Sequence, residues 1–532
     1  MSKVLNAMNS VNPSGMTWNG ALSNSTVGFG KYSDCLAYWI KAGTYRNRSQ
    51  SDVNHDMACI FADDVETAIK IVFGLRLISR NVKQLKTDDV QAGFGQRDEF
   101  FKAIKFMADF YPKELYANLH LIPIVGSWKD IFSEEILSTV SHDKLIDLIK
   151  EGLTSSREQE LISKYLPQIR SKSKVRSKRD GVRVEFARKV AKSLNISEKE
   201  YRLFKAGGRA HVWQQQMSAN EWDQIDFNTI PGKAMTNHIS QVGKQDRKTV
   251  FERHGLLDSL KTWALSKENI NFTGYPYDLT KAAAKSKNIV QDIVLDKQFN
   301  TLLKQFEGHS LGNVLVACDT SGSMSWEVND GVTALDVCLS LGLVFSALNL
   351  GFFKDSIVSF SNHSTLCKLS GDFKSRFNQI MGLNAMGSTN FQSVIDLIVR
   401  TRKQHPEIPV NEYPETLLVV SDMQFNPVSG NAETNYQRAV KELAAVGLGE
   451  MRIIWWFVNG AGKDFPSTMT DKGVYMVGGF DPAMLKVLIG QKAEEPTKKD
   501  VSKAESVVKS EATPLDGLMK FLNQEIFTLV KI

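Results

Sequence analysis

"VLVACDTSGSMS", residues 314–325, begins as an uninterrupted apolar run and ends in an acid followed by alternating hydroxyls. The run has the length of a strand and no polar alternation, which is typical of a strand buried on both faces of a sheet. Asp319, Ser321 and Ser323 follow at the carboxyl end of this strand, around Gly322. Because ligands of open α/β sheets bind at that end of the strands, the stretch predicts a parallel sheet with a polar site at its edge.

The chain from residue 311 onward alternates strands and helices. Apolar runs recur as "DSIVSFS", "TLLVVSD", "RIIWWFVN" and "GVYMVGG", with amphipathic stretches between most of them. This alternation favours an α/β domain with helices on both faces of the sheet, and we expect it to span 311–490. The lysine- and glutamate-rich stretch 491–512 has no apolar face and predicts a flexible charged insertion. Residues 513–532 are amphipathic and predict a C-terminal helix that packs on the α/β domain.

The upstream half has a helical pattern instead. Across residues 31–305, apolar side chains recur at intervals of three and four, and Pro112 and Pro123 divide the segments. Consecutive short helices joined by brief polar stretches predict an α-helical repeat module, preceded by an N-terminal arm at 1–30. A length of 532 residues also favours more than one domain.

The composition is that of a soluble globular protein, with 42% hydrophobic and 23% charged residues. Five scattered cysteines without the close spacing of a zinc site favour reduced thiols. The N-terminus lacks the apolar core of a signal peptide, and the longest apolar stretch is shorter than the roughly 18 residues of a membrane span. We therefore expect a cytoplasmic protein.

Two further loops bring oxygen atoms to the predicted sheet edge. Asp422 ends the strand "TLLVVSD", and "NAMGSTNF" carries Thr389 just before a helix. Together with the first loop they supply two carboxylates and three hydroxyls. Oxygen donors alone favour a hard cation, Mg²⁺ or Mn²⁺. Because so few charges leave such an ion under-neutralised, we expect its open position to attract an acidic group from a partner.

The D-x-S-x-S pattern, followed by a lone Thr and then an Asp, resembles the metal-ion-dependent adhesion site (MIDAS) of von Willebrand factor A (vWA) domains. The matching residues are Asp319, Ser321, Ser323, Thr389 and Asp422. The resemblance implies a Rossmann-like, doubly wound vWA domain. It also implies that the three hydroxyls are metal ligands and that the two aspartates bind the ion directly or through water.

Turn chemistry is the plainest alternative for this stretch. The serines and the glycine can simply form a turn, while Asp319 caps the following helix. That explanation leaves Thr389 and Asp422 as a coincidence.

Nucleophilic catalysis by Ser321 or Ser323 is another alternative, and it needs a histidine base. The nearest histidines in sequence, His309 and His363, belong to no recognisable arrangement. The chain also has neither the phosphate-binding loop pattern G-x-x-x-x-G-K-[ST] nor the zinc motif H-E-x-x-H. We therefore expect a binding protein and not an enzyme.

The helical half has a resemblance of its own. Stretches such as "TWNGALSN", "KYLPQIRSK" and "MSANEWDQIDFNTIPGKAM" are similar to a TROVE-like family whose members join a HEAT-like helical-repeat module to a C-terminal vWA domain. This family resembles, at a distance, the Ro ribonucleoprotein, which implies binding of small structured RNA. Part of the family looks viral, so a protein-interaction or assembly scaffold, including a structural component of a viral particle, is the alternative.

Positive charge is concentrated in one segment, although the net charge is only +6. Residues 170–189 hold nine Lys or Arg against two acids. Such a run is either a solvated helix face or a patch that binds RNA phosphates. The phosphate contacts predicted for the patch are Arg170, Lys172, Lys174, Arg176, Lys178 and Arg179.

Overall fold

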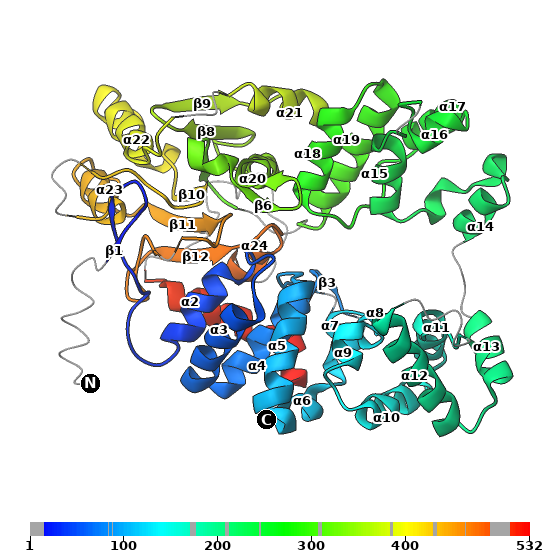
Figure 1. Cartoon of the computed structure of the whole chain (residues 1–532). Helices are drawn as coiled ribbons and strands as arrows, with labels where there is room; N and C mark the ends of the chain where they lie inside the picture. Colours follow the sequence, from blue (N-terminus) through cyan, green and yellow to red (C-terminus); the bar gives the residue numbers. More distant parts are fainter. Residues whose placement is uncertain are drawn as a thin grey trace. The chain divides into compact units, whose positions relative to one another are not determined.

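The computed structural model describes two compact units (Figure 1). It describes residues 15–532 except 83, 88, 171–176, 208–211, 244–245, 307–310, 384–386, 429–432, 463 and 490–510. Unit 1 comprises the described parts of 1–46 and 226–521, and unit 2 those of 47–225 and 522–532. The boundaries between the units follow residues 46, 225 and 521, whereas the sequence pattern favoured a boundary near residue 310. The predicted insertion at 491–512 lies almost wholly outside the described residues.

Among the described residues, unit 1 is built on a six-stranded sheet of order β12-β11-β10-β5-β8-β9. In that order the strands are Val474–Gly478, Arg452–Phe457, Thr416–Ser421, Val314–Asp319, Ser356–Phe360 and Ser364–Lys368. The first five run parallel, as predicted, while β9 pairs antiparallel with β8 through a hairpin. β5 and β10 lie in the middle and are buried at every position, which explains their uninterrupted apolar sequences.

Some helices of unit 1 cover this sheet, and others pack on other helices. In the described part of unit 1 the helices are α2 (Ser33–Ala42), α15 (Gly232–Ser240), α16 (Val250–Arg253), α17 (Leu257–Leu265), α18 (Pro276–Lys285), α19 (Ile289–Lys304), α20 (Ala334–Leu348), α21 (Phe373–Met381), α22 (Gln392–Gln404), α23 (Asn435–Ala444), α24 (Met484–Ile489) and α25 (Pro514–Leu522). α20 packs on β5 and β10, α22 on β8 and β9, and α2 on β12. α18 and α19 contact α20, so helices that lie before the sheet in the sequence belong to the same core.

The packing of α20 on the central strand is close. A Cβ atom placed on Gly342 of this helix would lie 2.5 Å from the Cys318 sulfur of β5. The helix can therefore approach the strand only because residue 342 has no side chain.

Unit 2 is helical, as the sequence pattern predicted. Its described helices are α3 (Gln50–Asp63), α4 (Val65–Arg76), α5 (Arg97–Phe110), α6 (Pro112–Asn118), α7 (Leu121–Val125), α8 (Trp128–Ile131), α9 (Glu134–Leu137), α10 (His142–Gly152), α11 (Ser156–Tyr165), α12 (Lys178–Ser193), α13 (Glu198–Ala206) and α14 (Val212–Ser218). α3, α4 and α5 pack on one another, and α11, α12 and α13 form a second group. None of the helices in the described ranges combines the length and the apolar character that a membrane crossing requires.

The C-terminal segment divides between the two units. α25 packs within unit 1, where the Phe521 ring lies 5.7 Å from that of Trp39 and Lys520 Nζ donates to the Tyr475 hydroxyl at 2.8 Å. The residues after α25 belong to unit 2, where the Lys531 amide donates to Asn118 Oδ1 at 2.8 Å. Residues at the end of the chain thus complete a helical unit that begins at residue 47.

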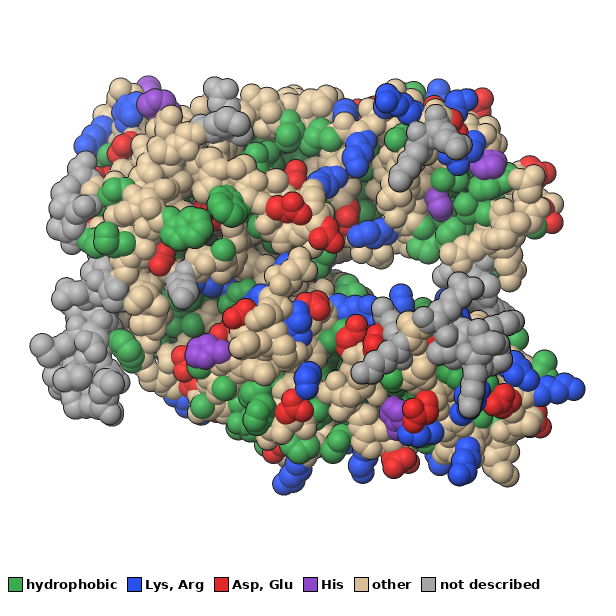
Figure 2. Space-filling view, viewed as in Figure 1, with side chains coloured by type: hydrophobic (Ala, Val, Ile, Leu, Met, Phe, Trp, Pro, Cys, Tyr) green, Lys and Arg blue, Asp and Glu red, His purple; other side chains and the backbone are tan. Residues whose placement is uncertain are grey.

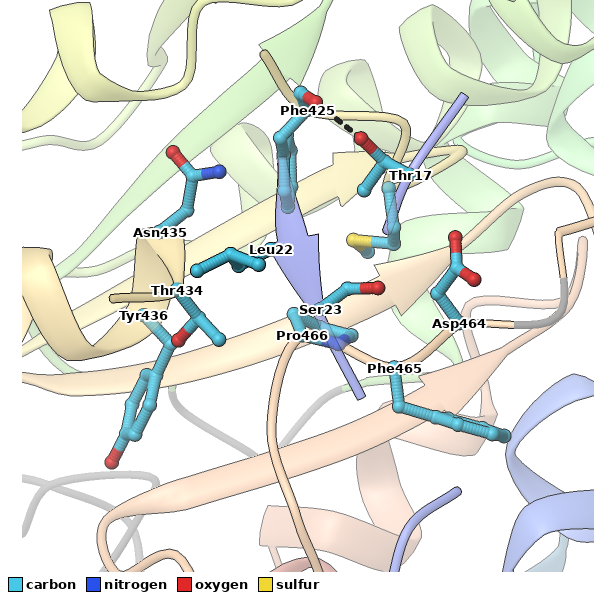
Figure 3. Close-up of a pocket in the computed structure, with 11 residues that line it drawn as sticks. Thr17, Leu22, Ser23, Phe425, Thr434, Asn435, Tyr436, Asp464, Phe465 and Pro466 are labelled. Carbon is cyan, nitrogen blue, oxygen red and sulfur yellow. Dashed lines mark hydrogen bonds between the residues drawn. The ribbon is translucent and has the colours of Figure 1, made fainter. Parts of the chain in front are cut away.

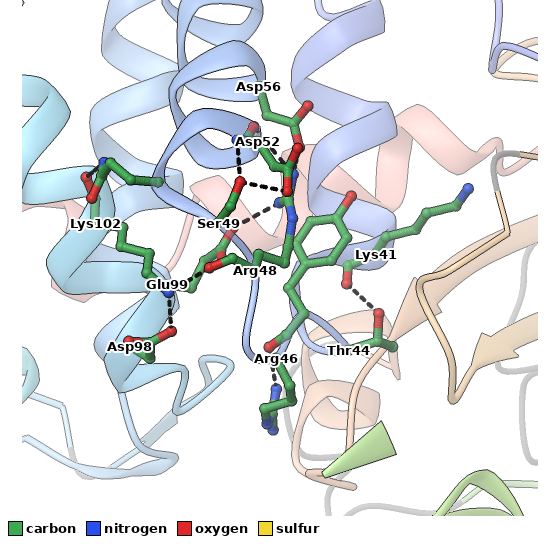
Figure 4. A network of polar contacts seen from close by, with 12 residues as sticks. Lys41, Thr44, Arg46, Arg48, Ser49, Asp52, Asp56, Asp98, Glu99 and Lys102 are labelled. Atoms are coloured by element: carbon green, nitrogen blue, oxygen red, sulfur yellow. Dashed lines mark hydrogen bonds and ion pairs between the residues drawn. The ribbon is translucent and has the colours of Figure 1, made fainter. Parts of the chain in front are cut away.

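Arg48 joins two helices of unit 2 (Figure 4). Its guanidinium lies 2.8 Å from Glu99 Oε1 on α5 and 2.5 Å from Asp56 Oδ2 on α3. The side chain of Glu99 is only 2% exposed, so its charge depends on this partner.

Asp130 forms a second and more deeply buried group. Its carboxylate is 1% exposed and lies 2.7 Å from Arg76 Nη2 and 2.8 Å from Arg97 Nε. It also accepts the Ser127 amide at 3.0 Å and so caps α8. One acid therefore compensates two arginines from α4 and α5 and fixes the start of a third helix.

We predict that Asp130→Asn lowers the free energy of unfolding by about 3 kcal/mol, because it leaves the buried Arg76 guanidinium without a counter-charge. Urea unfolding followed by circular dichroism measures the change. The matched control is Asp109→Asn, which removes an exposed pair with Lys105 and should cost less than about 0.5 kcal/mol. Equal midpoints for the two variants would contradict this account of the network.

Candidate functional site

The five predicted ligands lie on three loops at the carboxyl edge of the sheet. Asp319 is the last residue of β5, and Asp422 directly follows β10, the neighbouring strand. Thr389 precedes α22. All three side chains are buried, with 0%, 5% and 1% of their surface exposed. Polar groups buried to this degree require partners, so their contacts decide what the site can do.

The carboxylates and hydroxyls of this edge form a connected group. The Ser321 amide donates to Asp319 Oδ1 at 2.9 Å, and the hydroxyl oxygens of Ser321 and Ser323 are 3.2 Å apart. The Ser323 hydroxyl also acts on Asp422, where it partly offsets the rise in the pKa of that carboxyl. The side-chain oxygens of these residues therefore lie next to one another, in the order Asp319, Ser321, Ser323, Asp422.

Backbone hydrogen bonds tie the Thr389 loop to the other two loops. The Gly322 amide donates to the Gly387 carbonyl at 3.0 Å, which links it to the loop after β5. The Asn426 amide donates to the Thr389 carbonyl at 2.9 Å, and the Thr389 amide donates to Asn426 Oδ1 at 3.2 Å. The structure thus brings all three predicted loops to one edge.

The loop after β10 carries backbone strain at this point. Met423, directly after Asp422, has a φ of 63°. The left-handed region costs an ordinary side chain roughly 1–2 kcal/mol, and such strain gathers at functional sites. The Met423 amide donates to Ser421 Oγ at 2.9 Å, which holds this conformation in place.

Three side chains at the site were not predicted from the sequence. Ser421 donates to Asp319 Oδ2 and fixes the orientation of that carboxylate. Asn19, from the hairpin of β1 (Gly15–Met16) and β2 (Leu22–Ser23), donates to Thr389 Oγ1 at 3.2 Å. Gln424 accepts the Trp18 amide at 2.8 Å. Ser421 could have been found from its position beside Asp422, but Asn19 lies 370 residues from its partner and no local pattern marks it.

Burial raises the pKa of both carboxyls. For Asp319 the pKa rises to about 7, chiefly because of burial and secondly because of the charge of Asp422. The pKa of Asp422 is raised by burial. Within the described ranges neither carboxylate forms an ion pair with Lys, Arg or His. Two buried acids without a counter-cation create a strong local demand for positive charge.

The types of side chain at this edge determine which metal ion it would bind. Among the described residues no group of three or more His, Cys, Asp and Glu side chains could hold an ion. This edge offers instead two acids and three hydroxyls, a set that suits Mg²⁺ or Mn²⁺ and suits Zn²⁺ or Cu²⁺ poorly. Binding of an ion by these residues stays a prediction.

No described histidine lies in position to act as a base for the hydroxyls. Ser321 and Ser323 contact each other, and no described histidine hydrogen-bonds either of them. His309 lies outside the described residues. Nucleophilic catalysis therefore gains no geometric support from this part of the chain.

A small cavity lies under the N-terminal hairpin (Figure 3). It is lined by Leu22, Ser23, Phe425 and Phe465 among others, and its volume of about 10 Å³ is room for one water molecule. The Ser23 hydroxyl is buried without a partner in the described structure, so a water there would satisfy it. The cavity is too small for a substrate.

The edge also carries two exposed aromatic rings. Trp18 and Trp326 meet edge to face with 6.0 Å between ring centroids, and they are 70% and 60% exposed. Trp326 directly follows the 3₁₀ turn Gly322–Ser325 that contains Ser323. An apolar surface therefore adjoins the polar site.

The predicted RNA contacts lie largely outside what the structure describes. Lys172, Lys174 and Arg176 fall among the residues that are not described, and Lys178 and Arg179 begin α12 with side chains that are not described. Arg170 is described, and its Nη1 lies 3.5 Å from Asp180 Oδ1. Phosphate binding by this segment stays a prediction.

Comparison with known proteins adds three similarities. A family model described as "Domain of unknown function (DUF7788)" matches residues 313–522, a range that includes all five candidate ligands. An uncharacterized protein of Acanthamoeba polyphaga mimivirus is 19% identical over 521 residues, covering 90% of this chain and 85% of that protein. The crystal structure of Deinococcus radiodurans Ro (RSR) protein is similar at 12% identity and a TM-score of 0.34, covering 85% of this chain and 91% of that one.

The raised pKa of Asp319 predicts a pH dependence of stability in EDTA. The folded state holds a proton that the unfolded state, with a pKa of about 3.9, has released, so stability falls as pH rises from about 4 to about 7. Asp319→Asn removes this contribution, and its melting temperature should fall less than that of the wild type between about pH 5 and pH 8.

Scanning calorimetry at the two pH values measures the difference. Asp372→Asn serves as the control, because the hydrogen bond from Ser375 lowers the pKa of Asp372, so its contribution to stability is complete by about pH 5 and does not change up to about pH 8. Parallel curves for the wild type and Asp319→Asn would show that the Asp319 carboxyl does not hold the extra proton.

Proposed function

We propose that unit 1 contains a vWA-like domain that binds Mg²⁺ or Mn²⁺ at a MIDAS and uses it to bind a carboxylate of a partner. The ligands would be Asp319, Ser321, Ser323, Thr389 and Asp422. The observation that carries this proposal is a pair of buried carboxylates with no ion pair in the described structure, joined through serine hydroxyls at one sheet edge.

The charge balance permits a partner with an acid, and the number of ligands favours one. Two aspartates supply at most two negative charges and the hydroxyls none, so the ion is not over-neutralised by this chain. Five oxygen donors also leave a position open in the octahedron that Mg²⁺ prefers. An acidic side chain can occupy that position, while the exposed rings of Trp18 and Trp326 provide apolar contact beside it.

The proposal describes a binding protein and not an enzyme. When bound, the ion supplies a positive charge at the sheet edge. Hydrolysis would also need a base that is free to accept a proton, and in this proposal the two carboxylates at the serines, Asp319 and Asp422, are engaged as ligands of the ion. Ser421 and Asn19 would act as positioning residues, because they hydrogen-bond Asp319 and Thr389 and thereby fix the directions of the donor atoms.

We predict that millimolar MgCl₂ or MnCl₂ raises the melting temperature of the wild type. A ligand at one hundred times its Kd stabilises the folded state by about 2.7 kcal/mol. Asp319→Asn and Thr389→Val should lose this shift, since each removes a ligand. Ser325→Ala is the control, because its exposed hydroxyl bonds only the Gly322 carbonyl of its own turn. An equal shift in Asp319→Asn and the wild type would exclude this site.

Capture of partner proteins tests whether the bound ion is needed to hold a partner. Proteins captured with the wild type in Mg²⁺ should be released by EDTA and should not be retained by Asp319→Asn. Capture that is equal with and without metal would leave the ion without a role in partner binding.

A second candidate function is RNA binding by the helical unit. It is supported by the resemblance of the sequence to TROVE-like proteins and by the cations that lie on and near α11, α12 and α13. Figure 2 shows Lys and Arg side chains over the region of these helices at the lower right, with acids among them. An assembly scaffold remains the alternative, and the mimivirus relative is compatible with a role in a viral particle.

RNA binding predicts a steep dependence on salt. Filter binding with a small structured RNA should lose more than about tenfold in affinity between roughly 50 and 200 mM salt, because each phosphate contact releases counterions. Replacing Arg170, Lys172 and Lys174 with Gln should flatten the slope by about 3. Affinity no greater than that of a neutral control protein would argue against this function.

A further inference from the structure

A cavity of about 280 Å³ lies within unit 2 among α8, α11, α12 and α13. The charged side chains in its described lining are Lys129, Lys164, Arg170, Asp180, Arg183 and Lys205. Five of these are cations and one is an acid, in contrast to the near balance of charge over the whole chain. A hollow lined in this way favours an anion.

The single acid does not neutralise the cations. Asp180 Oδ1 lies 3.5 Å from Arg170 Nη1, at the limit of a useful contact. In the described structure neither Arg183 nor Lys205 forms an ion pair. The pKa of Lys205 is lowered, first by burial and then by the charge of Arg183. The cations therefore repel one another across the cavity, and a bound anion would relieve that repulsion.

The wall of the cavity is held in place by hydrogen bonds to the last turn of α11 and to the segment between α11 and α12. The buried Tyr201 hydroxyl donates to the Pro167 carbonyl at 2.8 Å, and Arg188 Nη2 donates to the Arg170 carbonyl at 3.0 Å. Lys205 Nζ donates to the Lys164 carbonyl at 3.2 Å. Because these bonds connect the segment to α12 and α13, the cations are positioned before any ligand arrives.

We propose that this cavity binds a phosphate monoester. A monoester carries nearly two negative charges and three terminal oxygens, which match an array of two arginines and three lysines better than a single carboxylate does. The volume admits the phosphate together with a small attached group, and the Tyr165 side chain in the lining offers a surface for that group. The site lies in unit 2 and does not depend on the cation site of unit 1.

The phosphate can come from two sources, a small phosphorylated molecule or the phosphorylated end of an RNA. Titration calorimetry on the full chain distinguishes them. The probes are adenosine 5′-monophosphate, adenosine, and a short oligoribonucleotide with and without a 5′-phosphate. The nucleotide or the phosphorylated oligonucleotide should bind, while adenosine and the unphosphorylated oligonucleotide should not.

The variant that tests the cavity is Arg183→Gln with Lys205→Gln, which should raise the Kd of the phosphorylated probe by about tenfold or more. The matched control is Lys192→Gln with Lys199→Gln, which removes the same charge from exposed positions of the same two helices outside the cavity. The control should leave the Kd within about twofold. Arg183→Gln alone, checked by its melting temperature, replaces the double variant if that variant unfolds.

The outcomes separate this proposal from RNA binding in general. Binding of the phosphorylated oligonucleotide alone identifies an RNA end as the source, and equal binding of the nucleotide identifies a small molecule. Equal binding of both oligonucleotides, lost in the double variant, would replace a monoester site with a backbone site and overturn the proposal. Unchanged affinity in the double variant would also overturn it. Failure of the salt-series experiment leaves the nucleotide result unaffected.

Discussion

The burial of Asp319 at the end of β5 is the constraint on which the rest of the sheet edge depends. A buried carboxylate is stable only if hydrogen bonds or a positive charge offset the hydration that it has lost. Ser421 from the neighbouring strand and the Ser321 amide do so in part, and Ser323 continues the chain of oxygens to Asp422. The strained loop at Met423 and the bonds to the Thr389 loop maintain this arrangement. These groups supply no positive charge to the two carboxylates, and the proposed cation would supply it.

The strands and the candidate ligands could be predicted from the sequence because they follow from local pattern. Apolar runs without alternation marked the parallel strands, and parallel strands place their ends at one edge, so Asp319 and Asp422 were expected at the same edge. That their strands are neighbours is a finding of the structure. The spacing of Ser321 and Ser323 around Gly322 then fixed the first loop. The five-residue set was also identified by its resemblance to the MIDAS of vWA domains.

The remaining features depend on contacts between distant parts of the chain. Asn19 donates a hydrogen bond to Thr389 from a hairpin near the N-terminus. No pattern in the local sequence marks a side chain that makes a single hydrogen bond of this kind. Helical periodicity predicted a helical pattern across residues 31–305 but not that α18 and α19 pack with α20, since an apolar face does not specify its partner. The cavity of unit 2 is similar in this respect. Arg170 and Arg183 belong to the charge cluster at 170–189, but no sequence pattern indicated that Lys129 and Lys205, from two other helices, lie beside them.

Both units are discontinuous in the chain, and this has a consequence for synthesis and folding. Unit 2 includes residues 522–532, which are synthesised after every residue of unit 1, and unit 1 joins Trp39 to the ring of Phe521. Contacts with so large a separation delay the completion of a fold. The nascent protein must therefore keep two unfinished cores protected until residues 522–532 have been synthesised, and a cut near residue 310 would not yield two independently folding halves.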